Sequence, residues 1–421
     1  MTTTLPLPYR FATATLPVAA ALFSPSGRAV TRARRESAAA LADWARISRD
    51  RSRPLVIIHA ASAGELRQAE PVIRRLRLRR PTWQLVVTYF SPSAAHVAPQ
   101  LQADATGYSP WDTAGEVTAF LEALDPTAIV CCKHDLWPAM ALVAHAHGVR
   151  LGMIAATVRP GSSRLHWPAR SLLERVYPTL KLVGAVSEED ARALGQLGVP
   201  PGRVVITGDP RYDAVLERLE GASLPALHPE MLVAGSTWPM DEEILLTAFR
   251  QVLEQRPLAR LLLVPHRPSA SRLRRIRRRA RAHGLPAPVS LDLAGPEDTL
   301  VVSEGVGTLA FDYARGSVAY VGGGFRGGGV HSVLEPAALQ KPVLAGPEAH
   351  DSRDARLLNH AEALEYLPRR RAAAVLEAWW INWARDPAWR SRAGRAARRV
   401  VEEGMGAADR GAALIERLVE S

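Results

Sequence analysis

Short apolar runs alternate with helical patterns along most of the chain. Segments with helical spacing, such as Leu66, Ala69, Ile73 and Leu76, lie between runs rich in β-branched and aliphatic residues. The runs of the first half are Leu55–Ala60, Gln84–Tyr89, Thr127–Cys132, Arg150–Ala156, Lys181–Val186 and Arg203–Thr207. Those of the second half are Met231–Ala234, Arg260–Val264, Thr299–Val302, Val318–Val321 and Pro342–Leu344. This alternation predicts an α/β fold with a parallel sheet in each half.

The two halves predict two Rossmann-like domains. Residues 217–229 carry Gly221, Pro225 and Pro229 without periodicity, so we place a linker there. We expect a basic segment over residues 1–50, a first domain over 51–216, and a second over 230–421 that includes the C-terminal helices. The length of 421 residues is too great for one ordinary core and agrees with this division. Ligands should bind in a cleft between the carboxyl ends of the two sheets.

Composition places the chain among soluble globular proteins. Hydrophobic residues make up 47% of it and charged residues 23%, and no run of 18 or more apolar residues could span a bilayer. Cys131 and Cys132 are neighbours, and a disulfide between them would be strained. We therefore expect a reducing, cytoplasmic setting.

The net charge of +11 indicates an anionic partner, which could be nucleic acid, anionic lipid or a phosphorylated small molecule. The densest basic run, Arg272–Arg281, keeps Leu273, Ile276 and Ala280 at helical spacing and contains no aromatic residue. That pattern favours the solvated face of an amphipathic helix over a nucleic-acid patch. We predict no nucleic-acid partner.

The N-terminal segment Pro8–Phe23 is mildly apolar, is interrupted by Pro17 and is followed by several arginines. Such a segment fits the interface of a membrane, where its basic flank would meet anionic headgroups. The alternative is a first helix that packs on the domain.

A glycine-rich stretch runs from Tyr320 to Pro347. An apolar run ends in Gly322, Gly323 and Gly324, a second glycine triplet follows, and a helix is expected to open near His331. Glycines let the backbone approach a ligand closely, and a helix start offers unpaired N–H groups, so this stretch suggests a phosphate site. The alternative is a turn that only connects two elements.

The turn after the first strand carries Ser62, Gly64 and Glu65. A carboxylate at the end of a strand could take a proton from an attacking hydroxyl, which would make Glu65 a general base. Ser62 and Glu65 also have the spacing of a capping box, which would favour Glu65 at the helix start whatever its function.

Other strand ends carry polar residues as well. Ser236 and Thr237 could hold a phosphate, although both are ordinary helix caps, and His266 and Arg267 could neutralise an anion. Glu335 could accept hydrogen bonds from ribose hydroxyls or act as an N-cap before Pro336. Lys133-His134-Asp135 lacks partners at metal-ligand spacing, so we predict no metal site.

The order of these motifs resembles the 3-deoxy-D-manno-octulosonic acid (Kdo) transferases of lipopolysaccharide synthesis. They form glycosyltransferase family 30 and have the GT-B fold, in which two Rossmann-like domains face each other across a cleft. The matching motifs are HAASAGE from His59, FSPS from Phe90, KHDLWP from Lys133, GDPRYD from Gly208, GSTWPMDEE from Gly235, Pro265-His266, and GGGFRGGGVHSVLEPAALQKPV from Gly322. Many members have an acidic residue where this chain has Lys133.

The resemblance implies an inverting transferase that moves Kdo from CMP-Kdo to a lipid A precursor at the cytoplasmic face of the inner membrane, as a peripheral protein without a cofactor. It implies that Glu65 is the base and that Glu335 meets the ribose of CMP. The implied donor-binding set is completed by Ser236, Thr237, His266, Arg267, Gly322, Gly323, Gly324, His331 and Ser332. The implied cleft or acceptor-binding set is Ser62, Gly64, Lys133, Asp135, Arg159 and Arg211.

Two other hypotheses stay open. A GT-B enzyme with a different nucleotide sugar could use the same motifs. A catalytically silent relative could bind only lipid or a partner, although such a protein would not need Glu65.

Overall fold

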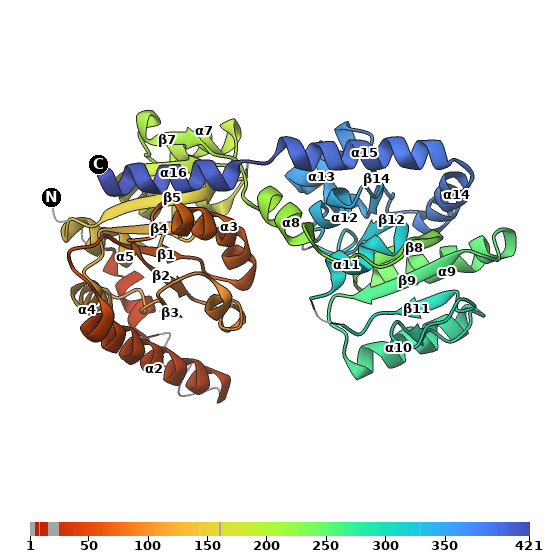
Figure 1. Cartoon of the computed structure of the whole chain (residues 1–421), viewed down its shortest axis with the longest axis horizontal. Coiled ribbons are helices and arrows are strands. Elements are labelled where there is room, and N and C mark those ends of the chain that lie inside the picture. The colour runs from red at the N-terminus through yellow and green to blue at the C-terminus, as the bar shows by residue number, and fades with distance from the viewer. Residues whose placement is uncertain (1–4, 8, 16–24, 160, 306, 328) are drawn as a thin grey trace. The chain divides into compact units, whose positions relative to one another are not determined.

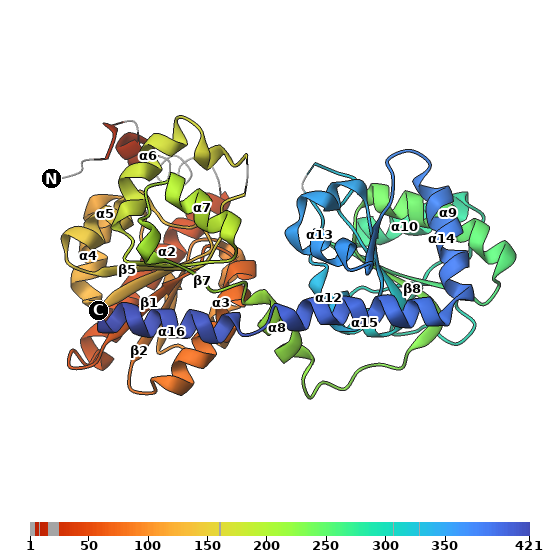
Figure 2. The ribbon, with the colours of Figure 1, turned by 90° about the horizontal axis from the view of Figure 1, so that it is seen from above.

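A computed structural model describes residues 5–7, 9–15, 25–159, 161–305, 307–327 and 329–421. The chain divides into two compact units, which are Met1–Ala214 together with Gly404–Ser421, and Val215–Glu403. Each unit contains one parallel sheet between layers of helices (Figures 1 and 2).

The first unit contains a seven-stranded sheet, as far as the chain is described, in the order β3-β2-β1-β4-β5-β6-β7. Its strands are β1 (Leu55–His59), β2 (Gln84–Tyr89), β3 (Ala105–Tyr108), β4 (Ala128–Cys132), β5 (Arg150–Ala156), β6 (Leu182–Ala185) and β7 (Val204–Ile206). Its helices of six or more residues are α2 (Pro25–Ser48), α3 (Ala63–Arg79), α4 (Ala114–Leu124), α5 (Pro138–Ala146), α6 (Ala169–Val176), α7 (Glu188–Gln196) and α16 (Ala407–Glu420), and α8 (Arg211–Leu219) crosses the boundary between the units.

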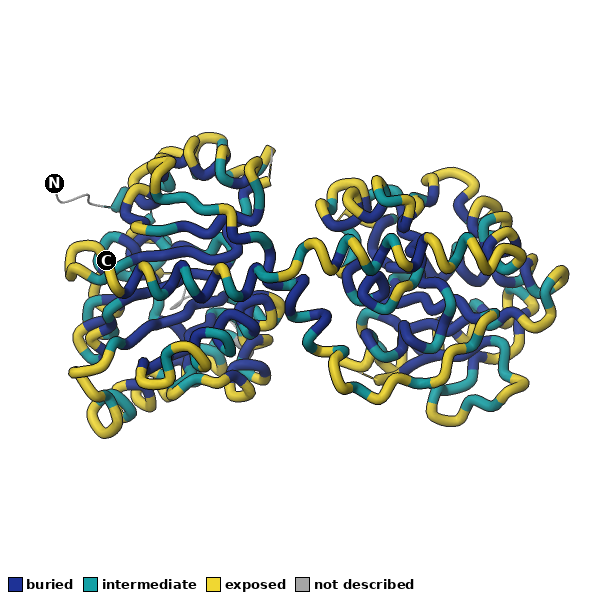
Figure 3. Tube along the Cα trace, turned by 45° about the horizontal axis from the view of Figure 1, so that its top comes forward, coloured by how far each residue is buried: buried dark blue, intermediate teal, exposed yellow. Residues whose placement is uncertain are grey.

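The alternation of side chains along each strand divides the core of this unit into two layers. In β1, Val56 and Ile58 pack toward α3 and α16, whereas Leu55 and Ile57 pack toward α4 and α5. Both faces are covered, so the central strands are buried along their whole length (Figure 3). This explains why they appear in the sequence as continuous apolar runs.

The second unit repeats the arrangement, with strand order β10-β11-β9-β8-β12-β13-β14 over its described residues. The strands are β8 (His228–Thr237), β9 (Arg260–Pro265), β10 (Val289–Ser290), β11 (Leu300–Val302), β12 (Gly316–Val321), β13 (Val343–Ala345) and β14 (Leu364–Tyr366). The helices are α9 (Pro239–Gln255), α10 (Ala270–Ala282), α11 (Leu309–Ala314), α12 (Leu334–Ala338), α13 (Arg353–His360), α14 (Ala372–Arg385) and α15 (Pro387–Glu403). One face of the sheet is covered by α9, α10 and α14, where Phe249 stacks on Trp380 with ring centroids 5.4 Å apart.

The α/β class with parallel sheets is confirmed in both units, and each predicted apolar run contains a strand. The sequence pattern missed β3, β10 and β14. These strands are short and contain few β-branched residues, so only their pairing with a longer neighbour makes them strands.

The units differ from the predicted domains at their boundaries. Residues 217–229, expected to be a linker, include the end of α8 and the beginning of β8. The last helix, α16, was assigned to the second domain and instead packs in the first unit on α3 and β5. There Leu418 fills the space above Gly152 of β5, where a Cβ would lie 2.5 Å from its Cδ2 atom.

The basic N-terminal segment contains α2, which packs on β3 and α4. Residue 8 and residues 16–23 of the proposed interfacial segment lie outside the described residues. Leu41 and Arg34 of α2 are buried, so this part of residues 1–50 is a helix packed on the unit. In the described part of the interfacial segment, residues 9–15 are helical and the hydroxyl of Tyr9 donates to Oδ2 of Asp112 at 2.6 Å. In the described part of the chain, no helix is both long and apolar enough to cross a membrane.

We predict that Leu418→Ala lowers the free energy of unfolding of the first unit by about 2–5 kcal/mol, because it removes a fully buried side chain from the layer between α16 and β5. Urea denaturation measures this loss. The control is Leu78→Ala on α3, whose side chain is 71% exposed and which should change stability by less than about 0.5 kcal/mol. Equal effects of the two substitutions would contradict the packing of α16 on this unit.

Candidate active site

The polar residues of the first unit meet at the point where the strand order reverses. The first strand, β1, is followed by α3, and Ser62, Gly64 and Glu65 lie at the beginning of this helix. The neighbouring strand, β4, is followed by Lys133, His134 and Asp135. Parallel strands place their carboxyl ends at the same edge, and a reversal of strand order leaves room for a ligand there. The structure therefore brings together two motifs that lie far apart in the sequence.

Glu65 lies in the first turn of α3 and is only 8% exposed. The backbone N–H of Ser62 donates to Oε2 of Glu65 at 3.2 Å, and the capping box is present. Nζ of Lys133 lies 3.8 Å from Oε1. The capping interaction thus orients the carboxylate with one oxygen on the backbone and the other toward a cation.

Lys133 has a left-handed backbone, with φ of 68°. This conformation is unfavourable for a side chain with a Cβ. It is held on both sides, because the N–H of Lys133 donates to the carbonyl of Ile154 and its carbonyl accepts from Thr157. The lysine is therefore held beside the glutamate by the sheet.

The carboxyl groups of Glu65 and Asp135 are neighbours, with oxygen atoms within 4.8 Å of each other. Burial, together with the neighbouring Glu65 carboxyl group, raises the pKa of Asp135 to about 7. Burial also opposes ionisation of Glu65, but the neighbouring Asp135 and the charge of Lys133 outweigh it and lower the pKa of Glu65. These opposite shifts favour a proton on Asp135 and an ionised Glu65 near neutral pH.

His134 adds a third potential ligand to this pair. The ligand atoms of Glu65, His134 and Asp135 lie within 4.8 Å of one another. The spacing in the sequence did not predict this cluster, because Glu65 comes from a distant part of the chain. Burial and nearby arginine and lysine charges lower the pKa of His134 to about 4. The shared proton and the Lys133 ammonium already supply positive charge here, so a metal-free site stays our prediction.

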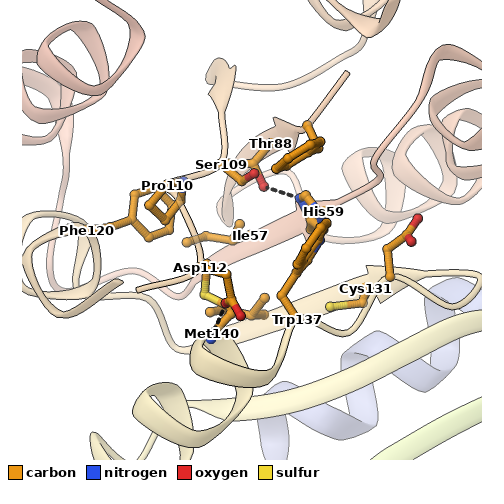
Figure 4. Close-up of a pocket in the computed structure, with 13 residues that line it drawn as sticks. Ile57, His59, Thr88, Ser109, Pro110, Asp112, Phe120, Cys131, Trp137 and Met140 are labelled. Carbon is orange, nitrogen blue, oxygen red and sulfur yellow. Dashed lines mark hydrogen bonds between the residues drawn. The ribbon is translucent and has the colours of Figure 1, made fainter. Parts of the chain in front are cut away.

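A small pocket with mostly apolar walls lies beside Asp135 (Figure 4). His59 and Trp137 line it, and the Trp137 ring stacks on Phe90 with centroids 4.9 Å apart. Nδ1 of His59 hydrogen-bonds Oγ1 of Thr88 at 3.1 Å, and burial lowers the pKa of His59 to about 4. Nε2 of His59, Oδ2 of Asp135 and Nε1 of Trp137 are buried without a hydrogen-bond partner among the described residues.

The remaining acceptor-side residues have different surroundings. A Cβ at Gly64 would meet open space, so the backbone at the start of α3 is accessible. Arg159 is exposed. Arg211 donates two hydrogen bonds to the buried carboxylate of Asp209, which also accepts from Gln68. Arg211 is thus held mainly by Asp209.

The glycine loop of the second unit differs from the expected phosphate cradle. The helix begins at Leu334 rather than near His331, and Val333 rather than Glu335 is its N-cap. The N–H groups of Gly322 and Gly323 already donate, to the carbonyl of Gly235 and to Oδ2 of Asp241. The N–H groups of these two loop glycines are therefore already used within the protein. The helix that follows the loop has only five residues, so its dipole offers less of a phosphate site than the sequence suggested.

The glycines instead allow close contact between loops. A Cβ at Gly322 would lie 2.4 Å from the carbonyl oxygen of Ser236, and Gly323 has φ of 98°. The buried carboxylate of Asp241 holds the loop, since it also accepts from the N–H of Trp238 at 2.8 Å and the hydroxyl of Tyr320 at 2.6 Å. The β8–α9 turn and the loop after β12 thus form one rigid surface at the second reversal of strand order.

Ser236 and Thr237 differ in accessibility. Ser236 has φ of 51° and lies at an irregularity in the pairing of β8 with β9, which redirects its side chain. Thr237 is 1% exposed, and its hydroxyl donates to Oε1 of Glu242 at 3.3 Å. Glu242 is in turn paired with Arg272 at 2.8 Å. Thr237 therefore belongs to a buried network beneath Ser236.

His266 and His331 belong to a stack of planar groups. The His266 ring packs against both Trp238 and His331, with centroids 4.8 and 4.3 Å away, while the nearly parallel rings of Trp238 and His331 have centroids 6.4 Å apart. The guanidinium of Arg326 lies 3.7 Å from the centroid of the Trp238 ring. Nε1 of Trp238 donates to Nε2 of His331 at 3.1 Å. Burial and the neighbouring His266 and Arg326 lower the pKa of His331 to about 4, so the ring is neutral and accepts this bond.

The other donor-side residues are less constrained. Arg267 is exposed, and so is Ser332 in the loop before α12. A carboxylate oxygen of Glu335 lies 4.0 Å from the guanidinium of Arg218. The structure thus places Ser236, His266, His331 and the glycine loop at one edge of the sheet.

Comparison with known proteins shows which family the chain is similar to. Residues 15–214 match the family model described as 3-deoxy-D-manno-octulosonic-acid transferase (kdotransferase). A protein of that name from Bordetella pertussis is 26% identical over 368 residues, which are 82% of each chain. The one from Aquifex aeolicus is 26% identical over 303 residues, covering 70% of this chain and 77% of the relative.

The chain is a homologue of the Kdo transferases. It is therefore a glycosyltransferase. Solved structures agree in fold. The UDP-GlcNAc 2-epimerase from Neisseria meningitidis matches 88% of this chain and all of its own, with a TM-score of 0.60 and 14% identity. The glycosyltransferase of kitacinnamycin matches 87% and 99%, with a TM-score of 0.56 and 17% identity. These similarities confirm the GT-B type α/β class of this Kdo transferase homologue.

Several residues of this Kdo transferase homologue that shape the two sites were absent from the sequence-based set. They are His59, Trp137, Trp238, Asp241 and Arg326. All five lie within the quoted motifs and could have been included on that ground. Their contacts, however, depend on residues from other strands, and no spacing rule reports those.

We predict that Arg272→Met destabilises the second unit by about 3–5 kcal/mol at pH 8, because it removes the nearer cation of the buried Glu242 carboxylate and leaves only Arg279, at 3.9 Å. Burial raises the pKa of Glu242 from 4.5 to about 7, so the folded state holds the extra proton in this window and its stability falls as pH rises through it. The loss caused by Arg272→Met should therefore be small at pH 5 and largest at pH 8. Urea denaturation at both pH values measures it.

The matched control is Arg274→Met, on the exposed face of the same helix. It should change stability by less than about 0.5 kcal/mol at either pH. A loss for Arg272→Met that does not depend on pH would show that Glu242 is not the group left unpaired.

Proposed function

We propose that the protein transfers Kdo from CMP-Kdo to a hydroxyl group of a lipid A precursor. The observation that carries this proposal is the buried, oriented carboxylate of Glu65 beside Lys133 at the switch point of the first sheet. The names of the relatives supply the sugar, and the nucleotide and the acceptor follow from the resemblance of the motifs.

In the proposed reaction, Glu65 accepts the proton of the acceptor hydroxyl as its oxygen attacks the anomeric carbon of Kdo. The new C–O bond forms while the bond from that carbon to the phosphate oxygen breaks, and the electron pair leaves with CMP. Attack from the face opposite the leaving group inverts the anomeric centre. Lys133 and Arg159 supply positive charge for the carboxylate of the sugar and the phosphates of the acceptor.

The second unit would bind the donor nucleotide. Ser236, which is 9% exposed, carries the hydroxyl beside the glycine loop, and Glu335 would accept hydrogen bonds from the ribose. The neutral His331 and His266, stacked with Trp238, present a planar surface with donors at its edge. This surface suits a nucleotide or the carboxylate of the sugar.

We also propose that the protein works on the cytoplasmic face of the inner membrane as a peripheral protein. The net charge of +11 would attract the chain to anionic headgroups, where the acceptor lies. Catalysis would need no cofactor.

We expect Glu65→Gln to lower kcat by about 10²–10⁴, roughly 2.7–5.5 kcal/mol of transition-state stabilisation, because the amide cannot accept the hydroxyl proton. CMP affinity should not change, since Glu65 belongs to the unit without the donor residues. Release of CMP from CMP-Kdo in the presence of a lipid A precursor measures turnover. The control is Glu70→Gln, one turn further along α3 and paired with Arg74, which should keep full activity.

A second experiment tests the donor. Calorimetric titration with CMP, UMP and GMP in EDTA should show selective CMP binding, which Glu335→Ala weakens at least about tenfold through loss of a charge-assisted hydrogen bond. The control is Glu304→Ala, an exposed glutamate of the same unit. Preference for UMP or GMP would favour a different nucleotide sugar, and no nucleotide binding would favour the silent relative. Unchanged CMP affinity in Glu335→Ala would remove Glu335 from the donor site.

A further inference from the structure

The surroundings of Glu65 and Asp135 differ although oxygen atoms of the two carboxyl groups lie within 4.8 Å of each other. Glu65 accepts from the N–H of Ser62 and faces the ammonium of Lys133. Asp135 has one oxygen, Oδ2, that is buried without a hydrogen-bond partner among the described residues, and it lines the apolar pocket of Figure 4. Two adjacent carboxylates cannot both ionise easily, and the proton stays on the one in the less polar surroundings. That one is Asp135.

We propose that Asp135 is a positioning residue for the transfer reaction: it shares one proton with Glu65, and loss of that proton makes Glu65 an effective general base. The inference rests on the proposed function, because it concerns the base of that reaction. While Asp135 is protonated, its O–H donates to the Glu65 carboxylate and weakens it as a base. Once Asp135 ionises, the repulsion between two negative charges raises the proton affinity of Glu65.

The neighbouring Asp135, once ionised, raises the proton affinity of Glu65, which Lys133 alone would make too low for a general base. A lone glutamate beside Lys133 would be strongly ionised and a poor proton acceptor at neutral pH, whereas general bases work best with a pKa near the working pH. With both carboxyl groups ionised, the pair takes up its first proton near pH 7. The ammonium of Lys133 then stabilises the form in which both carboxyl groups are ionised, so this form can be reached.

The charged and titratable groups around the pair come from several elements. They are His59 at the end of β1, Cys131 and Cys132 in β4, Lys133 and His134 in the loop after β4, Arg159 and Arg164 after β5, Tyr177 after α6, and Asp112 and Asp209 in loops. Burial holds the pKa of His59 and of His134 at about 4, so both are neutral above pH 5. Burial raises the pKa of both cysteines and of Tyr177, so these stay uncharged near pH 7. Asp135 is thus the group of this cluster expected to change charge near pH 7.

The kinetic test is the pH dependence of kcat/KM for the complete protein with CMP-Kdo and a lipid A precursor. The wild type should rise about tenfold per pH unit below pH 7 and level off above it. Asp135→Asn should lose this rise and fall at least about tenfold below the wild type at pH 8, because its amide always donates to Glu65. Asp135→Glu, which restores an ionisable carboxyl, should recover the rise, and Lys133→Met should move it to higher pH.

The control is Asp125→Asn, which precedes β4 and therefore lies at the opposite edge of the sheet from Asp135. It should keep the wild-type profile. A rise that persists in Asp135→Asn would overturn the proposal, as would a profile that EDTA abolishes, since the cluster with His134 would then be a metal site.

Infrared difference spectroscopy between pH 5.5 and 8.5 provides a test without substrate. The wild type should show a buried protonated carboxyl band that disappears near pH 7, and the band should be missing in Asp135→Asn and retained in Glu70→Gln. No such band in the wild type would overturn the pair even if transfer is observed. A band without any Kdo transfer would support the pair and refute the proposed function, so the two failures are distinguishable.

Discussion

Parallel pairing of the strands is the constraint on which both sites depend. It places all strand ends of one kind at one edge of each sheet, and reversal of the strand order separates two neighbouring helices there. In the first unit the reversal between β1 and β4 brings Glu65 to Lys133 and Asp135. In the second, the reversal between β8 and β12 brings Ser236 to the glycine loop. The same strand arrangement therefore places the proposed base at the strand ends of one unit and the glycine loop at the strand ends of the other.

Buried carboxylates organise the two edges in different ways. Asp241 accepts from three donors and serves to hold the glycine loop. Glu242 is neutralised by Arg272 and the hydroxyl of Thr237. The carboxyl groups of Glu65 and Asp135 have fewer hydrogen-bond donors and cations around them. In our proposal they share a proton instead. Incomplete satisfaction of buried polar groups is costly for stability and is found where chemistry takes place.

The capping box and the catalytic hypothesis, which were alternatives for Glu65 in the sequence, are compatible in the structure. The bond from the N–H of Ser62 fixes the glutamate rotamer and leaves the other oxygen toward Lys133. A base held in one orientation loses little entropy when the acceptor arrives. The structural and functional roles of the residue thus rely on the same hydrogen bond.

The sequence by itself determined the α/β class, the longer strands of both sheets and the resemblance to the Kdo transferases, because buried parallel strands form continuous apolar runs and the motifs follow one another in a specific order. It also singled out Glu65, whose position at a strand end is a local property. Only the tertiary structure decided that α16 returns to the first unit, that the glycine loop is held by Asp241, and that Asp135 lies beside Glu65. These features depend on contacts between residues distant in the chain, and burial at such contacts, rather than spacing, sets which group holds a proton.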